Sequence, residues 1–130
     1  MALAYSSTIR TAQVDAITTA VGGSALLRIY DGTRPATGGA ATTLLAELTC
    51  NATFAPGGVA GVLTLNAITA DATANATGTA TWFRILTSGA AFMIDGDVGT
   101  SGSDLNLNST AIQAGAAVSV SAFTITAGNA

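Results

Sequence analysis

Short runs of leucine, β-branched and aromatic residues recur along this chain at spacings of roughly ten residues, separated by glycine- or proline-containing turns. Only residues 7–21 form a stretch long enough to predict a helix, and Gly22-Gly23 ends it. Many short strands joined by tight turns are typical of β-sandwiches and jelly rolls. Since 130 residues is a common size for one domain, we expect a single mainly β domain over residues 1–130. The expected fold is a jelly-roll-like β-sandwich of about eight strands with one short N-terminal helix.

The predicted helix covers about residues 8–21 of an N-terminal segment that spans residues 1–23. Ser7 or Thr8 can cap its first turn, because a hydroxyl at that position accepts a backbone N–H. One stripe at helical spacing consists of Ile9, Gln13, Ala16, Ile17 and Ala20. This stripe is small and rich in alanine, so we expect the helix to pack on a sheet or on a partner.

The segments that predict strands are 25–30, 44–48, 62–65, 78–86, 92–98, 104–108 and 118–126. A Ser88-Gly89 turn predicts a hairpin between the fourth and fifth of these. In the last segment the apolar phase shifts near Ala122, which predicts a bulge or a strand that bends from one sheet to another. Residues 66–77 are short-chained and fit an edge strand or a loop, so their role stays open.

Charge is scarce: charged residues make up 8 % of the chain, with four arginines, no lysine and seven carboxylates, whereas about 25 % is typical. Binding to nucleic acid needs basic residues clustered on one face, so we expect no nucleic-acid partner. A surface of Thr, Ser, Ala, Gly and Asn loses little side-chain entropy when another protein covers it. Lysine usually protects edge strands from pairing, and it is missing here. The composition therefore favours a protein packed against neighbours over a secreted or abundant protein with a plain surface.

The residue types also bear on catalysis. Without histidine or lysine, the chain can build neither a histidine-based hydrolytic triad nor a phosphate-binding loop. The single Cys50 can form no intrachain disulfide and no zinc cluster, and we expect it to be a small buried hydrophobe. We therefore expect no enzymatic activity and no cofactor. The N-terminal residues lack the pattern of a signal peptide and no apolar run reaches about 20 residues, so we expect no membrane partner.

The best candidates for chemistry are three acids. Asp95 and Asp97 flank a glycine, and Asp104 lies nearby; hard cations such as calcium bind carboxylate oxygens. A calcium loop needs further acidic ligands, however, and Glu47 is the only glutamate. A glycosidase pair would need a substrate cleft in addition to two carboxyl groups. We predict no metal site and no catalytic residue, and keep the three aspartates only as weak metal candidates.

Four residues are candidates for a protein interface: Tyr30, Arg34, Trp82 and Arg84. Tryptophan and arginine contribute most to binding energy at protein interfaces, so Trp82 beside Arg84 on an outward face can anchor one. The alternative is that one of Trp82 and Phe83 fills the core while the other covers a sheet face under the helix. The sequence leaves both interpretations open.

Several segments together resemble a family of small virion proteins of tailed phages. They are residues 11–17, 25–36, 44–48 and 78–85, the turn at 112–115, and the closing residues 123–130. The resemblance implies a capsid decoration protein, also called a cement protein, with a jelly-roll-like fold, bound outside the major capsid lattice. It implies a location on the exterior of the phage head after synthesis in the bacterial host cytoplasm, and it implies no catalytic residues.

The partners expected from this resemblance are the major capsid protein and further copies of the chain, as a dimer or trimer. Multivalent contact stabilises a shell, and edge strands can contribute by β-augmentation. We expect the N-terminal helix or the Ala127–Ala130 tail to reach a neighbour. Two alternatives remain: a component of the tail or its fibres, and a carbohydrate- or calcium-binding β-sandwich module displayed on the particle.

Overall fold

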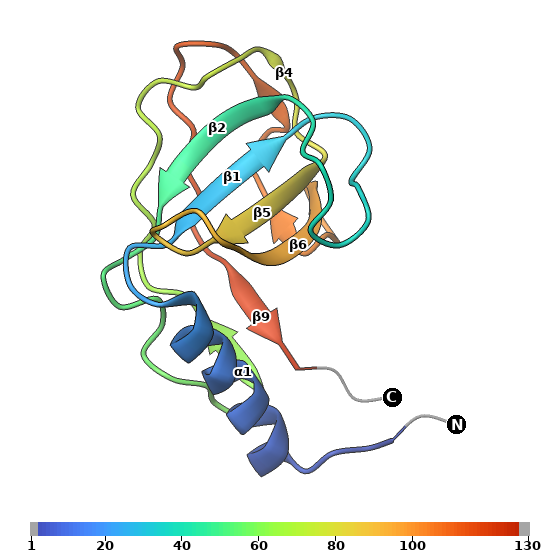
Figure 1. The fold of residues 1–130 in the computed structure, drawn as a ribbon, viewed down its shortest axis with the longest axis vertical. Coiled ribbons are helices and arrows are strands. Elements are labelled where there is room, and N and C mark those ends of the chain that lie inside the picture. Colours follow the sequence, from blue (N-terminus) through green and yellow to red (C-terminus); the bar gives the residue numbers. More distant parts are fainter. Residues whose placement is uncertain (1–2, 128–130) are drawn as a thin grey trace.

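A curled five-stranded sheet is the main element of the fold, and one helix and a two-stranded ribbon extend from one end of it (Figure 1). The computed structural model describes residues 3–127. The helix is α1 (Ser7–Val21). Within the described residues the nine strands are β1 (Leu26–Tyr30), β2 (Leu44–Thr49), β3 (Val62–Thr64), β4 (Gly78–Thr79), β5 (Trp82–Leu86), β6 (Phe92–Gly99), β7 (Leu105–Asn106), β8 (Ala111–Ile112) and β9 (Thr124–Thr126).

The strand order in the large sheet is β2-β1-β5-β6-β7, while β3 pairs with β9 and β4 pairs with β8. All pairs are antiparallel except β6 with β7. The prediction of a mainly β chain with one helix is confirmed. The strand count is nine instead of about eight, and a two-sheet jelly-roll sandwich is not confirmed.

Alternation along the central strands gives the sheet two faces. Leu27 and Ile29 of β1 and Phe83 and Ile85 of β5 are buried on the face that we call the inner face. This face packs in one core with side chains from both small ribbons, among them Leu63, Ile112 and Phe123. The opposite, outer face of the sheet carries the side chains at the alternate positions of the same strands. The strands therefore form because each presents an apolar row to a common core.

The predicted helix is confirmed, with one correction to its cap and one to its buried face. The hydroxyl of Ser6, not of Ser7 or Thr8, accepts the backbone N–H of Ile9 at 3.3 Å. The residues of α1 that are buried are Val14 and Val21, whereas Ile9 at the head of the predicted stripe is exposed. Gln13, Ala16 and Ala20 of that stripe are exposed as well, and Ile17 packs partly against the core. The predicted stripe is therefore wrong as the buried face, apart from Ile17.

Residues 66–77, whose role the sequence left open, lie along the outer edge of β2. Thr69 and Thr49 exchange two backbone hydrogen bonds, of 2.8 and 3.4 Å. A carboxylate oxygen of Asp71 accepts the backbone N–H of Glu47 at 3.0 Å, taking the place of a strand carbonyl. An exposed strand edge is a site for unwanted pairing. This segment therefore occupies the β2 edge that self-association could otherwise use.

The bend predicted near Ala122 is confirmed. Val118 forms a bridge with Asp71, whereas β9, six residues farther on, pairs with β3. The segment 78–86 is also divided, because β4 pairs with β8 while β5 joins the large sheet. The predicted hairpin at Ser88-Gly89 is present as the antiparallel pair β5–β6.

Candidate functional site

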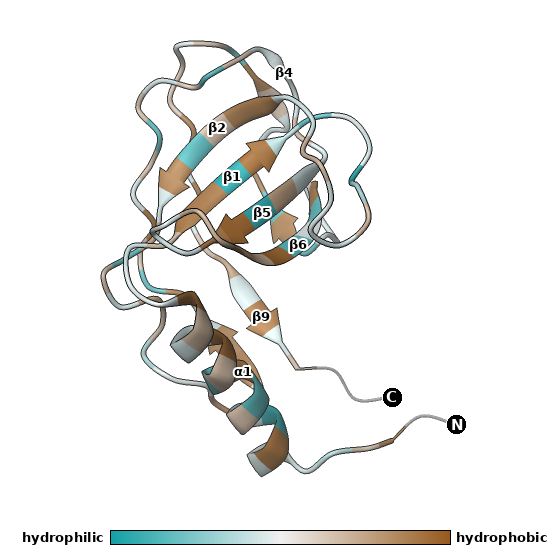
Figure 2. Cartoon of the chain, viewed as in Figure 1, coloured by the Kyte–Doolittle hydropathy of each residue, from teal (hydrophilic) through white to brown (hydrophobic). Residues whose placement is uncertain are grey.

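A row of four charged side chains crosses the outer face of the sheet. Glu47, Arg28, Arg84 and Asp95 lie opposite one another on β2, β1, β5 and β6. Arg28 Nε donates to Glu47 Oε2 at 2.6 Å, and Arg84 Nε donates to Asp95 Oδ1 at 2.7 Å. In Figure 2 the strands β2, β1 and β5 each carry a hydrophilic band within a largely hydrophobic strand. Arg28 and Arg84 lie directly opposite each other, and like charges in that position repel. The carboxylates of Glu47 and Asp95 at the two ends of the row offset this repulsion.

The Arg84 end of this row is enclosed, while the Arg28 end is open to water. The side chains of Arg84 and Asp95 are only 9 % and 5 % exposed, against 28 % and 36 % for Arg28 and Glu47. The Arg84 guanidinium lies 5.2 Å from the ring centre of Trp82 and 5.1 Å from that of Phe92. A cation between two aromatic faces is stabilised by their electron density.

The loop between β1 and β2, residues 31–43, covers this enclosed end. Trp82 Nε1 donates to the carbonyl of Asp31 at 3.0 Å and to the hydroxyl of Thr42 at 2.9 Å. Arg84 Nη2 donates to the carbonyl of Gly39 at 2.9 Å. The ring of Trp82 also stacks on Tyr30, with 4.3 Å between ring centres. The loop and the outer face therefore form a small second core, separate from the one on the inner face.

Burial removes three of the four expected interface residues from the surface of the chain. Trp82 is fully buried, and Tyr30 and Arg84 are nearly so. Arg34 alone is substantially exposed, and its Nε lies 3.4 Å from a carboxylate oxygen of Asp97. Of the two interpretations of Trp82 and Phe83, the structure supports a split between core and sheet face, but the 31–43 loop covers Trp82, not the helix. The alternation of side chains along a strand assigns Trp82 and Phe83 to opposite faces of the sheet, but it does not show what covers either face.

The three weak metal candidates do not converge. Asp95 pairs with Arg84, and Asp97 lies beside Arg34. Asp104 Oδ2 accepts the backbone N–H of Asp97 at 2.9 Å. Among the described residues no group of three or more acidic, cysteine or histidine side chains is placed to hold a metal ion. Each acid therefore has a structural role in holding strands or loops together.

The Asp-Gly-Asp motif has a packing explanation. A methyl group on Gly96 would lie 2.5 Å from two ring carbons of Phe83. Phe83 is itself fixed edge-to-face against Phe123, with 5.2 Å between ring centres. Gly96 is therefore required because the backbone of β6 passes directly over a core aromatic ring.

We expect Gly96→Ala to lower the free energy of unfolding by about 1–3 kcal/mol, because the added methyl group overpacks the core. Urea denaturation followed by tryptophan fluorescence measures the change. The matched control is Gly89→Ala, since a methyl group there would meet nothing closer than 3.8 Å. Equal stability of Gly96→Ala and the wild type would contradict this explanation of the motif.

The ionised carboxyl group of Asp95 should make the stability of the fold sensitive to acid. Burial by itself raises the pKa of this carboxyl group, but hydrogen bonds from Arg84 and from the Gly38 amide, together with the arginine charge, lower the pKa overall. A lowered folded pKa stabilises the fold above the unfolded value of about 3.9, and this contribution is lost as the pH falls through the folded value. We expect the wild type to lose stability between about pH 5 and pH 3 more steeply than Asp95→Asn. Urea titrations at several pH values test this, and parallel curves would contradict it.

Cys50 is buried, and burial raises the pKa of its thiol to about 11. Because the thiolate is the reactive form, we expect the native protein to resist labelling by a thiol reagent at pH 8. Labelling in denaturant is the control and should be complete. Rapid labelling of the native protein, measured by mass spectrometry, would show that Cys50 is accessible.

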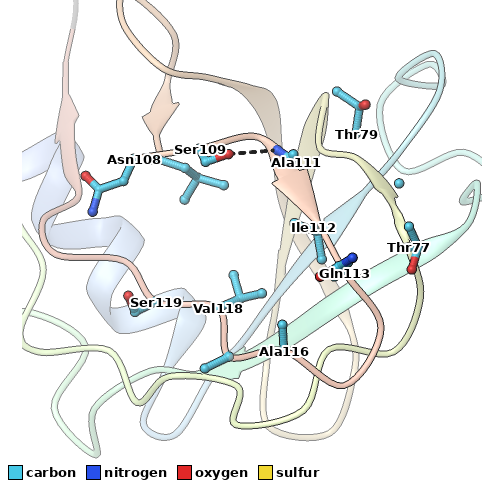
Figure 3. A pocket seen from close by; sticks show the side chains of 13 residues that line it. Thr77, Thr79, Asn108, Ser109, Ala111, Ile112, Gln113, Ala116, Val118 and Ser119 are labelled. Atoms are coloured by element: carbon cyan, nitrogen blue, oxygen red, sulfur yellow. Dashed lines mark hydrogen bonds between the residues drawn. The ribbon is translucent and has the colours of Figure 1, made fainter.

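A surface hollow of about 630 Å³ lies around β4 and β8 (Figure 3). Its polar lining comes from hydroxyl and amide side chains, including Thr77, Thr79, Asn108 and Gln113, over apolar residues such as Ile112. None of its lining residues is charged or aromatic. The hollow therefore offers neither a carboxylate for a cation nor a ring on which a sugar could stack.

Large apolar side chains are exposed on the arm before α1, on the first turn of α1 and on the turn that packs beside it. We call this the distal end: Leu3 and Tyr5 before α1, Ile9 in its first turn, and Val59. Leu3 is 70 % exposed and Val59 76 %. The turn that carries Val59 lies beside the first turns of α1, because the Gly61 N–H donates to Thr11 Oγ1 at 3.0 Å. Apolar residues exposed together mark an interaction surface more often than single ones do.

A scan against protein-family models and searches of curated proteins and of solved structures found no match to this chain. In the described part of the chain no helix is long and apolar enough to cross a membrane. Sequence reasoning missed Glu47 and Arg28 as members of the charged row. Arg28 and Arg84 both alternate with the core-facing residues of their strands. This shared alternation could have indicated that the two arginines lie on the same face of the sheet.

Proposed function

We propose that this chain is a structural virion protein that decorates the capsid of a tailed phage and stabilises it by binding the major capsid lattice. The observation that carries the proposal is the distal end, where Leu3, Ile9 and Val59 expose apolar surface beside an almost uncharged exterior. Such a surface costs little to desolvate when another protein covers it, because few charges lose water.

The arrangement of charges supports this proposal. Arg28, Arg34 and Arg84 each pair with a carboxylate of the chain itself. Arg10 donates to the carbonyl of Ala60 at 3.4 Å. Since the arginines are engaged within the fold, the surface left for contacts consists mainly of hydroxyl, methyl and amide groups. The proposal therefore assigns the chain no nucleic-acid or membrane partner, no cofactor and no catalytic role.

We infer further that the fold is a jelly-roll-like variant. The β3–β9 and β4–β8 ribbons supply Leu63 and Ile112 to the core of the large sheet, in the position that a second sheet takes in a sandwich. In this proposal the protein is made in the host cytoplasm and binds the outside of the phage head. It also binds further copies of itself, as a dimer or trimer.

Binding to empty capsids tests the proposal directly. Capsid shells of the source phage that lack this protein are mixed with purified protein, sedimented and heated. We expect saturable co-sedimentation and a higher disruption temperature of the shells. Absence of binding would contradict the proposal, and binding confined to purified tails would move the protein to the tail or its fibres.

A pair of charge-adding variants tests the assignment of the distal end. Val59→Asp places a charge among its exposed apolar side chains, whereas Thr79→Asp places the same charge beside the hollow at the opposite end of the sheet. We expect only Val59→Asp to weaken binding to shells. Equal weakening by both variants would contradict the assignment.

A further inference from the structure

The loop that covers the outer face, residues 31–43, is attached to the sheet by polar groups and not by buried side chains. Every residue of this loop is exposed or half-buried, and none belongs to the core on the inner face. A segment with few buried apolar contacts can open at a lower free energy than the whole fold. Opening of the loop therefore leaves the packing of the inner core in place.

The two ends of the loop are fixed to each other and to β5. The Asp31 carbonyl accepts Trp82 Nε1 at 3.0 Å, and the Asp31 carboxylate accepts the Thr43 N–H at 3.1 Å. The Gly32 carbonyl accepts the hydroxyl of Thr81 at 2.5 Å. These contacts hold the base of the loop, where the chain leaves β1 and enters β2.

The tip of the loop, residues 36–41, is held by a single ion pair on the sheet. Asp95 Oδ2 accepts the Gly38 N–H at 3.0 Å, and the Gly39 carbonyl accepts Arg84 Nη2 at 2.9 Å. Within the described chain no other hydrogen bond joins the tip to the sheet. The tip therefore stays on the sheet as long as Asp95 and Arg84 keep these positions.

Arg84 keeps its position because the carboxyl group of Asp95 is ionised. Asp95 accepts Arg84 Nε at 2.7 Å and Nη2 at 3.0 Å, and both side chains are nearly buried. A buried cation that loses its counter-charge is strongly unfavourable. An uncharged Asp95 therefore favours a state in which the guanidinium reaches water. Because the loop covers this end of the charged row, reaching water requires the tip to move.

The other charged and titratable side chains on the elements around Asp95 have partners of their own and do not replace Asp95. They are Arg28, Glu47 and Tyr30 on β1 and β2, Asp31 and Arg34 on the loop, Asp97 on β6, and Asp104 before β7. Among the cations in this set, Arg28 pairs with Glu47, and Arg34 lies beside Asp97. The Arg84–Asp95 pair is therefore the one contact on which the tip depends.

We propose that residues 36–41 form a latch: the ionised carboxylate of Asp95 keeps it on the sheet, and loss of that charge lets it lift while the inner core stays folded. This inference goes beyond the proposed function and does not depend on it. In the open state the guanidinium of Arg84 leaves the ring of Trp82, so one face of the indole is uncovered. Trp82 and Arg84, which the sequence predicted at an interface, are accessible only in this state.

Acid is one way to remove the charge, and the direction of its effect follows from the contacts of Asp95. Although burial raises the pKa of Asp95, its hydrogen bonds with Arg84 and Gly38 and the charges of Arg84 and Arg34 lower it overall. The latch therefore stays closed below the usual carboxyl value of about 3.9. It opens as the pH falls through the lowered value.

Two residues that each occur once report separately on the latch and on the inner core. Trp82 is the only tryptophan and its ring centre lies 5.2 Å from the Arg84 guanidinium. Cys50 is the only cysteine and belongs to the inner core. Acrylamide quenching of fluorescence measures access to Trp82, and labelling with a maleimide at pH 7 measures access to Cys50.

Asp95→Asn removes the charge and keeps the shape of the side chain. We expect several-fold stronger quenching of Trp82 at pH 7, with labelling of Cys50 as slow as in the wild type. The matched control is Asp97→Asn, which removes a charge from an exposed position of the same strand and should leave both probes unchanged. Unchanged quenching in Asp95→Asn, equal quenching in both variants, or faster labelling of Cys50 together with the quenching overturns the proposal.

An acid titration of the wild-type protein tests the latch without any substitution. We expect Trp82 to become quenchable while far-UV circular dichroism still reports the native fold. If Trp82 stays protected until the circular dichroism signal is lost, the loop opens only with the whole fold and the proposal is wrong.

Discussion

Replacing Trp82 by alanine is expected to lower the free energy of unfolding by about 3–5 kcal/mol. The indole is fully buried, stacks on Tyr30 and bonds to Asp31 and Thr42 of the covering loop. Its removal leaves a cavity and also frees the loop that encloses Arg84. Since a domain of this size is stable by about 5–15 kcal/mol, the variant should lose a large share of its stability. Denaturant titration followed by circular dichroism measures the loss.

Trp82→Phe separates packing from hydrogen bonding. Phenylalanine can keep the stack on Tyr30 but donates nothing to the Asp31 carbonyl, so we expect a loss of only about 1–3 kcal/mol. Equal losses for the two variants would show that the hydrogen bonds, and not the ring, hold the loop. A negligible loss for Trp82→Ala would contradict the existence of a second core beneath residues 31–43.

Arg84→Ala should be nearly as damaging, with an expected loss of about 3–5 kcal/mol, because it leaves the buried Asp95 carboxylate without its partner. Arg28→Ala is the matched control. It removes the same side chain one strand away in the same row, where both partners are partly exposed and a pair contributes about 1 kcal/mol or less.

Urea denaturation of both arginine variants at pH 7 and pH 3 gives the comparison. At pH 3 the Arg84→Ala deficit should shrink, because protonation removes the charge that the substitution left unpaired. Similar losses for Arg84→Ala and Arg28→Ala at pH 7 would contradict the difference in burial between the two ends of the row.

Alternation within strands predicted the faces of the sheet well. Leu27 and Ile29 were assigned to one face and Arg28 to the other, and the structure agrees. The cover on the outer face could not be predicted in this way. Residues 31–43 have loop composition, and the contacts that fold them over Trp82 join positions about 40 to 50 residues apart in the chain.

Other features lay beyond local pattern for related physical reasons. The acidic Asp95 and Asp97 looked like metal candidates because the sequence does not show that Arg84 and Arg34 lie opposite them. The role of residues 66–77 depends on the contact of Asp71 with the edge of β2. Such a contact produces no repeating pattern of apolar residues in the sequence, so it could not be predicted. Of the C-terminal tail expected to reach a neighbour, residues 128–130 lie outside the described residues, so that expectation stays a prediction.

The most direct measurement is the number of copies of this polypeptide relative to the major capsid protein in purified virions of the source phage. Quantitative mass spectrometry with labelled peptides of both proteins gives the ratio. We predict hundreds of copies, in a simple ratio to the capsid protein. A dozen or fewer copies would contradict decoration of the lattice and indicate the tail or a vertex, and absence from the particle would contradict a structural role in the virion.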